Sequence, residues 1–287
     1  MQYAVFLACG AIWGSTFLFI SLGNDEVAPV WAAALRLGLA SLILLAITLI
    51  RRERLPRGDA FKAAFLYGLL GFGINFPILY IAEQVVPSGI TAVFYATIPI
   101  STAFYAKFFG LEPLQARKLL AALVAIVGLA FIFNSQLNAN VPARYLIALI
   151  VSASMASLSG VLLKRGPRQS SIGANAVGTA VGFAIVTPIS FILGEHHTLP
   201  STFDAAFPII YLTIAGSVGA YVLFGWLVNH WPVTTISFIT VIIPVIALAL
   251  GVFVRSETVG PASFIGAALV IAALFIVLKP HNEPVSN

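Results

Sequence analysis

The chain has 287 residues, of which 60% are hydrophobic and 9% charged, with a formal net charge of +5. A soluble domain is about 45–50% apolar and about 25% charged, so this chain has too few polar side chains to cover a water-soluble globule. The composition excludes a soluble enzyme and a nucleic-acid-binding domain, and it assigns the positive charge to membrane topology. The single cysteine, Cys9, excludes an internal disulfide framework and a multi-cysteine metal site.

Apolar runs long enough to cross a bilayer recur along the whole chain. Such a helix needs about 20 mostly apolar residues, and glycine, proline and charge mark the breaks between runs. The first run is expected to be a retained helix and not a cleavable signal peptide, since no basic segment precedes it. The fold class is therefore predicted to be all-α and polytopic. The predicted spans are 3–22, 27–50, 63–83, 88–107, 116–134, 145–164, 172–194, 205–228, 233–254 and 260–278.

Basic residues are distributed unevenly between the two sides of these spans. The loops after spans two, four and six, with the C-terminus, hold 12 of the 15 Lys and Arg residues. The opposite side holds only Arg144 and Arg255, and Arg36 lies inside span two. Because cytoplasmic loops are enriched in Lys and Arg, both termini are predicted to be cytoplasmic.

An internal repeat is indicated when the sequence is shifted against itself by 145 residues. The matched pairs are Gly71 and Gly216, Pro87 and Pro232, Pro99 and Pro244, and Glu112 and Glu257. We therefore predict two five-helix halves, residues 1–137 and 138–287, within one membrane domain. Since five is odd, the second half enters the membrane from the opposite face, as in carriers that work by alternating access. The alternative is a chance placement of Gly and Pro in similar apolar helices.

Ionisable residues are scarce inside the predicted spans. Arg36 lies within span two, and Glu83 lies at the outer end of span three. Arg36 is interpreted as snorkelling or donating to loop carbonyls, with a pathway-lining role as the alternative, and Glu83 as an interfacial residue. Because an ion-coupled site normally places carboxylates at mid-membrane, the pattern favours an uncharged or zwitterionic substrate.

Two prolines, Pro99 and Pro244, fall near the middle of spans four and nine. Proline removes a helix hydrogen bond and frees a carbonyl, which is tolerated at that depth only beside protein or a water-filled cavity. We predict that they act as hinges. The alternative is that they produce kinks that only shape helix packing.

Aromatic and small polar side chains gather near these breaks. Trp13, Asn75, Tyr95 and Tyr221 lie well inside their spans, so they are stronger candidates for a binding site than aromatic residues at headgroup depth. Their rings can contribute about 0.5–1.5 kcal/mol per aromatic contact, and the Asn75 amide suits a zwitterion. The alternative is that these side chains only pack the helices together.

The segment Ala11-Ile12-Trp13-Gly14-Ser15-Thr16-Phe17, the pair Leu35-Arg36 after Trp31, and Pro99 followed by Gly110-Leu111-Glu112-Pro113 carry a family resemblance. Over residues 3–279 the chain resembles the EamA branch of the drug/metabolite transporter superfamily. The resemblance implies a bacterial inner-membrane exporter of aromatic and other amino acids, with a central cavity lined by spans one, three, four, six, eight and nine. The implied substrate-binding residues are Trp13, Phe17, Asn75, Leu79, Thr91, Tyr95, Ser154, Leu158, Tyr221 and Phe238. The chain departs from the family at Ser157-Leu158-Ser159-Gly160, where many members carry a tryptophan.

The sequence thus predicts a monomeric transporter of amino acids embedded in the lipid bilayer, with no cofactor, metal or nucleic-acid partner. The alternatives are an exporter of another small metabolite, of nucleotide sugars or of drugs, and a passive channel. A membrane-embedded enzyme would need a nucleophile and a base paired at depth, and no such motif is evident in the sequence.

Overall fold

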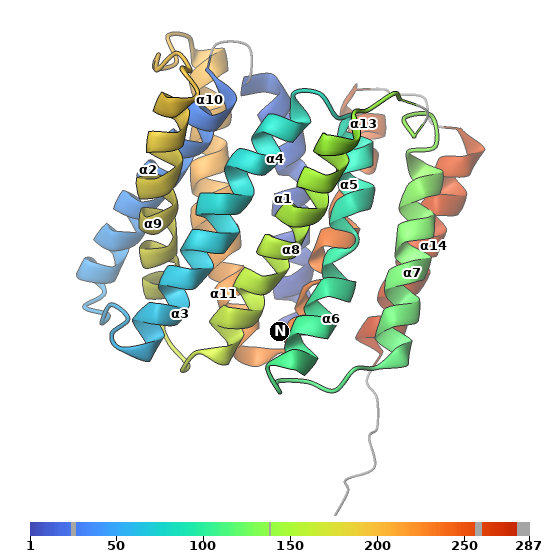
Figure 1. Cartoon of the computed structure of the whole chain (residues 1–287), viewed down its shortest axis with the longest axis horizontal. Coiled ribbons are helices and arrows are strands. Elements are labelled where there is room, and N and C mark those ends of the chain that lie inside the picture. Colours follow the sequence, from blue (N-terminus) through green and yellow to red (C-terminus); the bar gives the residue numbers. More distant parts are fainter. Residues whose placement is uncertain (24–26, 138, 256–259, 280–287) are drawn as a thin grey trace, which may run out of the picture.

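The computed structural model describes residues 1–23, 27–137, 139–255 and 260–279, apart from the side chains of 17, 18, 20–23, 251 and 253–255. These residues form a bundle of helices without strands (Figure 1). In chain order, with η marking π-helical segments, the elements are α1 (Gln2–Gly23), α2 (Pro29–Ile50), α3 (Asp59–Gly68), η1 (Leu69–Ile74), α4 (Asn75–Glu83), α5 (Ser88–Tyr95), α6 (Ile98–Phe108), α7 (Ala116–Ile132), α8 (Ala143–Arg165), α9 (Ser171–Ile192), α10 (Phe203–Tyr211), η2 (Leu212–Gly219), α11 (Ala220–His230), α12 (Val233–Ile236), α13 (Ile239–Arg255) and α14 (Pro261–Leu278).

The predicted all-α, polytopic fold class is confirmed. Within the described residues, 8 spans are long and apolar enough to cross a membrane, and α1 and α7 complete the predicted ten. Span three begins earlier than predicted, at Asp59, because Gly58 adopts a φ of +58° and turns the chain directly before it. A left-handed backbone of this kind favours glycine, and an acidic residue in a first helical turn is favourable.

Spans three and eight each contain a wide π-helical turn at related positions. In span three, η1 joins α3 to α4, and in span eight, η2 joins α10 to α11. Pro77 follows η1 and lacks the N–H that would bond to the Gly73 carbonyl in an α-helix, which favours an altered turn there. The repeat pair Gly71 and Gly216 falls within the two π-helical segments.

Spans four and nine are both interrupted, but at different points relative to their prolines. Span four breaks at residues 96 and 97, directly before Pro99 near the start of α6, as predicted. Span nine breaks at residues 237 and 238, whereas Pro244 lies inside α13, so the prediction that Pro244 marks that break is wrong. The tighter turn lies before Pro244, where the N–H groups of Thr240 and Val241 donate to carbonyls only three residues back. Hinge motion at either proline stays a prediction.

The two halves pack on each other in reciprocal fashion. Helix α1 packs on α10, α11 and α13, and α8 packs correspondingly on α3, α4 and α6; α2 pairs with α9, and α7 with α14. Figure 1 shows α3 below α4 but α10 above α11, so the equivalent spans run in opposite directions. This arrangement fits an inverted repeat; a boundary at residue 137 stays a prediction, and Glu257 lies outside the described residues.

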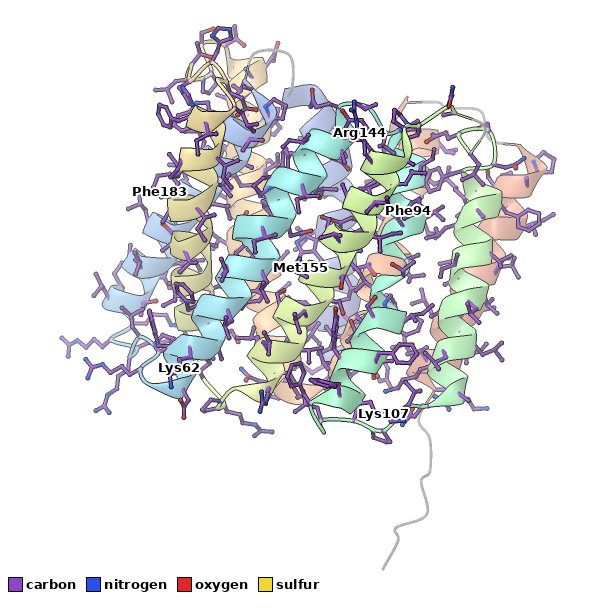
Figure 2. The ribbon with its side chains drawn as sticks, viewed as in Figure 1. Lys62, Phe94, Lys107, Arg144, Met155 and Phe183 are labelled. Atoms are coloured by element: carbon purple, nitrogen blue, oxygen red, sulfur yellow. The ribbon has the colours of Figure 1, made fainter. Side chains whose placement is uncertain are left out.

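The start of α1 and the end of α14 lie at one edge of the bundle. The Tyr3 hydroxyl donates a hydrogen bond of 3.0 Å to the Leu278 carbonyl. Figure 2 places Lys62 and Lys107 at that lower edge and Arg144 at the upper edge. The separation of charge agrees with the loop assignment, while the orientation of the lower edge in the membrane stays a prediction.

Candidate substrate cavity

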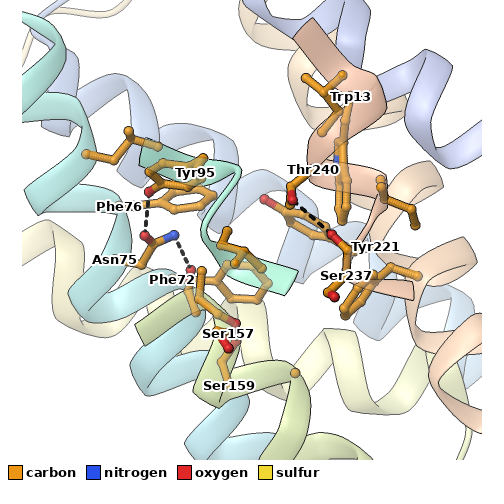
Figure 3. A pocket seen from close by; sticks show the side chains of 18 of the residues that line it. Trp13, Phe72, Asn75, Phe76, Tyr95, Ser157, Ser159, Tyr221, Ser237 and Thr240 are labelled. Atoms are coloured by element: carbon orange, nitrogen blue, oxygen red, sulfur yellow. Dashed lines mark hydrogen bonds between the residues drawn. The ribbon is translucent and has the colours of Figure 1, made fainter. Parts of the chain in front are cut away.

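A cavity of about 220 Å³ lies between the two halves of the bundle. Its walls come from α1, α2, span three, span four, α8, span eight and span nine. Figure 3 shows Tyr95, Phe76 and Phe72 on one side of this space, with Trp13, Tyr221, Ser237 and Thr240 on the other. The cavity is therefore built jointly by the first and second halves of the chain.

Aromatic rings form one continuous wall of the cavity. The Phe72 and Tyr221 rings lie 4.8 Å apart between centroids, and Trp13 lies 5.9 Å from Tyr221 and 5.6 Å from Phe224. Separations of this kind are favourable for offset or edge contacts between rings. The Trp13 indole N–H also donates to the Gly216 carbonyl at 3.1 Å, which fixes the ring and satisfies a carbonyl of the η2 segment.

A polar network lies on the side of the cavity that Tyr95, Phe76 and Phe72 line (Figure 3). The hydroxyls of Tyr95 and Ser152 lie 2.7 and 2.5 Å from Asn75 Oδ1, and one amide N–H of Asn75 donates to the Gly71 carbonyl at 3.1 Å. The Asn75 amide is thus largely engaged within the protein and retains one N–H for other partners. Of the amide that the sequence suggested for a zwitterion, the oxygen is already occupied by the two hydroxyls.

Arg36 is buried and lines the cavity, so the interpretation that it snorkels or bonds loop carbonyls is wrong. Its Nε donates to Ser217 Oγ at 2.6 Å and its Nη2 to the Tyr221 hydroxyl at 3.3 Å. The guanidinium carbon lies 5.6 Å from the Phe76 ring centroid and 5.8 Å from that of Tyr221, within cation–π range. Because α2 packs against η2 and α4, Ser217 and Phe76 reach the guanidinium inside the bundle.

Glu83, the last residue of α4, also lines the cavity. Its atom Oε1 is buried and has no hydrogen-bond partner in the described part of the structure. The spacing carried the signal: Asn75, Leu79 and Glu83 are four residues apart, so they share one helix face, and all three line the cavity. A carboxylate therefore lies in the wall of the cavity at the end of α4.

Of the predicted site residues, Trp13, Asn75, Leu79, Tyr95 and Tyr221 line the cavity. The others are placed elsewhere, as follows. Thr91 is buried, Ser154 bonds the Tyr105 hydroxyl at 2.6 Å, Leu158 is half-buried outside the lining, Phe238 is buried in the core, and the Phe17 side chain lies outside the described part of the chain.

Span six contributes a different face from the one predicted. Ser157 and Ser159 line the cavity in place of Ser154 and Leu158. Ser157 bonds Thr102 at 2.9 Å, which turns this face of α8 toward span four. The Ser157 and Ser159 side chains are both small and polar, so α8 presents a narrow polar face to the cavity.

Comparison with known proteins gives a consistent result over nearly the whole chain. The model of the EamA-like transporter family matches residues 1–134 and 143–279. An uncharacterized inner membrane transporter of Escherichia coli K12, YedA, is 29% identical, covering 96% of this chain and 90% of that protein. A probable amino-acid metabolite efflux pump of Salmonella typhimurium is 24% identical, covering 92% of this chain and 90% of that protein.

One solved crystal structure is similar to this fold with a TM-score of 0.80, at 16% identity and 96% coverage of both chains. At that identity the likeness establishes the fold alone. The family match spans both halves of the chain, including the spans that build the cavity. The chain is a membrane transporter that belongs to the EamA-like transporter family.

Proposed function

We propose that this protein exports amino acids, aromatic and other neutral ones, from the cytoplasm across a bacterial inner membrane. The observation that carries the proposal is the aromatic wall of the cavity, where Phe72 and Tyr221 lie 4.8 Å apart beside Trp13. Burying a Phe-sized side chain against such a wall contributes about 1.5–3 kcal/mol, part of which offsets the desolvation of the zwitterion. Weak binding of this order suits a carrier that must also release its substrate.

Relatives support the same substrate class. A probable amino-acid metabolite efflux pump of Escherichia coli K12, like its Salmonella typhimurium counterpart, aligns over 92% of this chain, at 21% identity. At this identity the substrate of a relative is a guide to the chemical class to test first. The zwitterionic class also agrees with the mixture of rings and hydroxyls in the cavity.

The proposed mechanism is alternating access by a monomer. The two inverted halves rock about the cavity, and the interruptions of spans four and nine, beside Pro99 and ahead of Pro244, serve as bending points. Both termini lie on the cytoplasmic side in this proposal, because the Lys-rich and Arg-rich loops share their edge. The protein needs no cofactor and catalyses no covalent reaction in this cycle.

Counterflow in liposomes tests the proposal. Purified protein is reconstituted with unlabelled amino acids inside, and labelled phenylalanine is added outside. We expect labelled phenylalanine to accumulate transiently only when a neutral amino acid is preloaded. An exchanging carrier takes unlabelled substrate out of the liposome and brings labelled substrate in on its return. Absence of accumulation with every amino acid would overturn the substrate class. Panels of nucleosides, sugars and cationic drugs would then follow, and uptake without saturation or exchange would indicate a channel.

A further inference from the structure

Arg36 is a buried cation that lacks an ionic partner. It is 5% exposed, and its contacts include the hydroxyls of Ser217 and Tyr221 and two aromatic rings. In the described part of the chain no carboxylate oxygen lies within 4.0 Å of its nitrogens. A charged residue at this depth is costly unless it is paired, and these neutral contacts leave its charge uncompensated. Charged residues buried in membrane proteins usually mark functional sites.

Glu83 is a partly buried carboxylate that lacks a cationic partner, as Arg36 lacks an anionic one. Its Oε1 is buried without a hydrogen-bond partner among the described residues, and no basic nitrogen of that part of the chain lies within 4.0 Å. A buried carboxylate oxygen without a donor is costly. Glu83 therefore has capacity for a cationic hydrogen-bond donor.

The two uncompensated charges face the same cavity. Arg36 and Glu83 both line it, as does Tyr80, which lies three residues before Glu83 in α4. A ligand with only a negative charge would meet the Glu83 carboxylate, and a ligand with only a positive charge would meet the Arg36 guanidinium. A small zwitterion satisfies both residues at once.

Resting on the export function proposed above, we propose that Arg36 and Glu83 form the headgroup site for an α-amino acid. The guanidinium fork of Arg36 binds the substrate carboxylate, a planar pairing for which arginine is well suited. The Glu83 carboxylate accepts from the substrate ammonium. The substrate side chain then packs against the Phe72, Tyr221 and Trp13 rings, which adjoin Arg36 at the Tyr221 hydroxyl.

Three phenylalanine-like compounds separate the two charges experimentally. Phenylalanine carries both, phenylalaninamide lacks the carboxylate, and 3-phenylpropionate lacks the ammonium. Their competition with labelled phenylalanine is measured in counterflow for wild type, Arg36→Gln, Arg36→Lys and Glu83→Gln. Arg144→Gln and Asp59→Asn are matched controls, because both residues are exposed and outside the cavity.

Wild type is expected to prefer phenylalanine to either analogue by at least tenfold. Arg36→Gln should abolish the preference over phenylalaninamide, Glu83→Gln should abolish the preference over 3-phenylpropionate, and both controls should keep both preferences. Arg36→Lys keeps the charge but loses the fork, so it should retain an intermediate preference. If Arg36→Gln does not fold, the Arg36→Lys variant provides the test. If Arg36→Lys prefers phenylalanine to phenylalaninamide as strongly as the wild type does, the role of the guanidinium fork is overturned.

Thermal stabilisation of the purified protein by a ligand reports binding without transport, so it tests the headgroup site separately from the export function. Stabilisation by phenylalanine but by neither analogue, in a protein that gives no counterflow, would support the headgroup site and overturn only the export function. Counterflow of phenylalanine with no discrimination against the analogues, or with discrimination unchanged in Arg36→Gln and Glu83→Gln, would overturn the headgroup site while export stands. Neither counterflow nor stabilisation by phenylalanine would overturn both.

Discussion

The indole N–H of Trp13 donates to the carbonyl of Gly216 across 3.1 Å, which ties α1 of the first half to the π-helical segment of the second. In the other half, the carbonyl of Gly71, the repeat partner of Gly216, accepts from the side chain of Asn75. In each π segment, a carbonyl at the repeat position thus bonds a cavity-lining side chain. The two halves use different side chains for the same task, and this makes the cavity asymmetric.

Replacement of Trp13 separates its hydrogen bond from its ring. Trp13→Phe removes the indole N–H but keeps an aromatic surface, and it should lower counterflow a few-fold. Trp13→Ala also removes the ring contacts to Tyr221 and Phe224, and it should lower counterflow about tenfold or more. A tenfold decrease corresponds to a loss of about 1.4 kcal/mol of binding free energy. Rates are normalised to the amount of protein in the membrane. Trp31→Phe, outside the cavity, is the control, and unchanged rates in both Trp13→Ala and Tyr221→Ala would remove these residues from the site.

Tyr95→Phe tests the polar network. The change removes the hydroxyl that lies 2.7 Å from Asn75 Oδ1, and should lower the free energy of unfolding by about 0.5–1.5 kcal/mol while it weakens substrate binding. Tyr105→Phe is a matched control, because its hydroxyl bonds Ser154 at 2.6 Å away from the cavity. Thermal unfolding should show similar losses for both variants, and only Tyr95→Phe should raise the KM for phenylalanine. An equal KM in both would contradict a role of the network at the site.

The contact of α7 with α14 depends on two facing glycines. A Cβ at Gly128 would come within 2.7 Å of the Gly266 carbonyl oxygen, and a Cβ at Gly266 would clash with the backbone of Gly128. Small residues allow membrane helices to approach this closely. Gly266→Ala should therefore destabilise the protein by about 1–3 kcal/mol, measured by thermal unfolding in detergent. Gly260→Ala, where nothing lies within 4 Å, should be neutral, and equal melting temperatures for the two variants would refute the packing argument.

Lys164 holds the connection between α11 and α12. Its Nζ donates to the carbonyls of Val228 and Trp231 at 2.6 and 2.9 Å. Lys164→Met should loosen this edge and increase access to the cavity from it. A cysteine at Ser237, which lines the cavity, should then react several-fold faster with an impermeant maleimide in inside-out vesicles, in a Cys9→Ala background.

Lys107→Met is the control for the Lys164 experiment, because Lys107 is exposed at the same edge and lies in α6, outside the α11–α12 connection (Figure 2). Faster labelling only in right-side-out vesicles would place the edge outside and contradict the predicted orientation. Labelling unchanged by Lys164→Met in either vesicle type would contradict the role of Lys164 in closing the cavity.

The sequence by itself determined the ten spans, their order and the relation between the halves. A bilayer requires about 20 apolar residues in each helix, so length and composition suffice to locate the spans. The position of Pro99 predicted the interruption of span four, since proline cannot continue the hydrogen bonding of the preceding turn. Trp13, Tyr95 and Tyr221 were identified as candidates by their depth in the spans, and the structure turns all three toward the cavity.

Only the tertiary structure decided which helix faces meet. Ser157 and Ser159, not Ser154 and Leu158, line the cavity because the rotation of α8 is set by its packing on spans three and four, which periodicity alone does not specify. The same holds for Arg36. Its guanidinium could form hydrogen bonds either at the membrane surface or with hydroxyls inside the bundle, and the sequence does not distinguish the two. The packing of η2 on α2 brings Ser217 within 2.6 Å of the guanidinium, which keeps the side chain inside. Long-range packing therefore determined which charged side chains lie in the cavity wall.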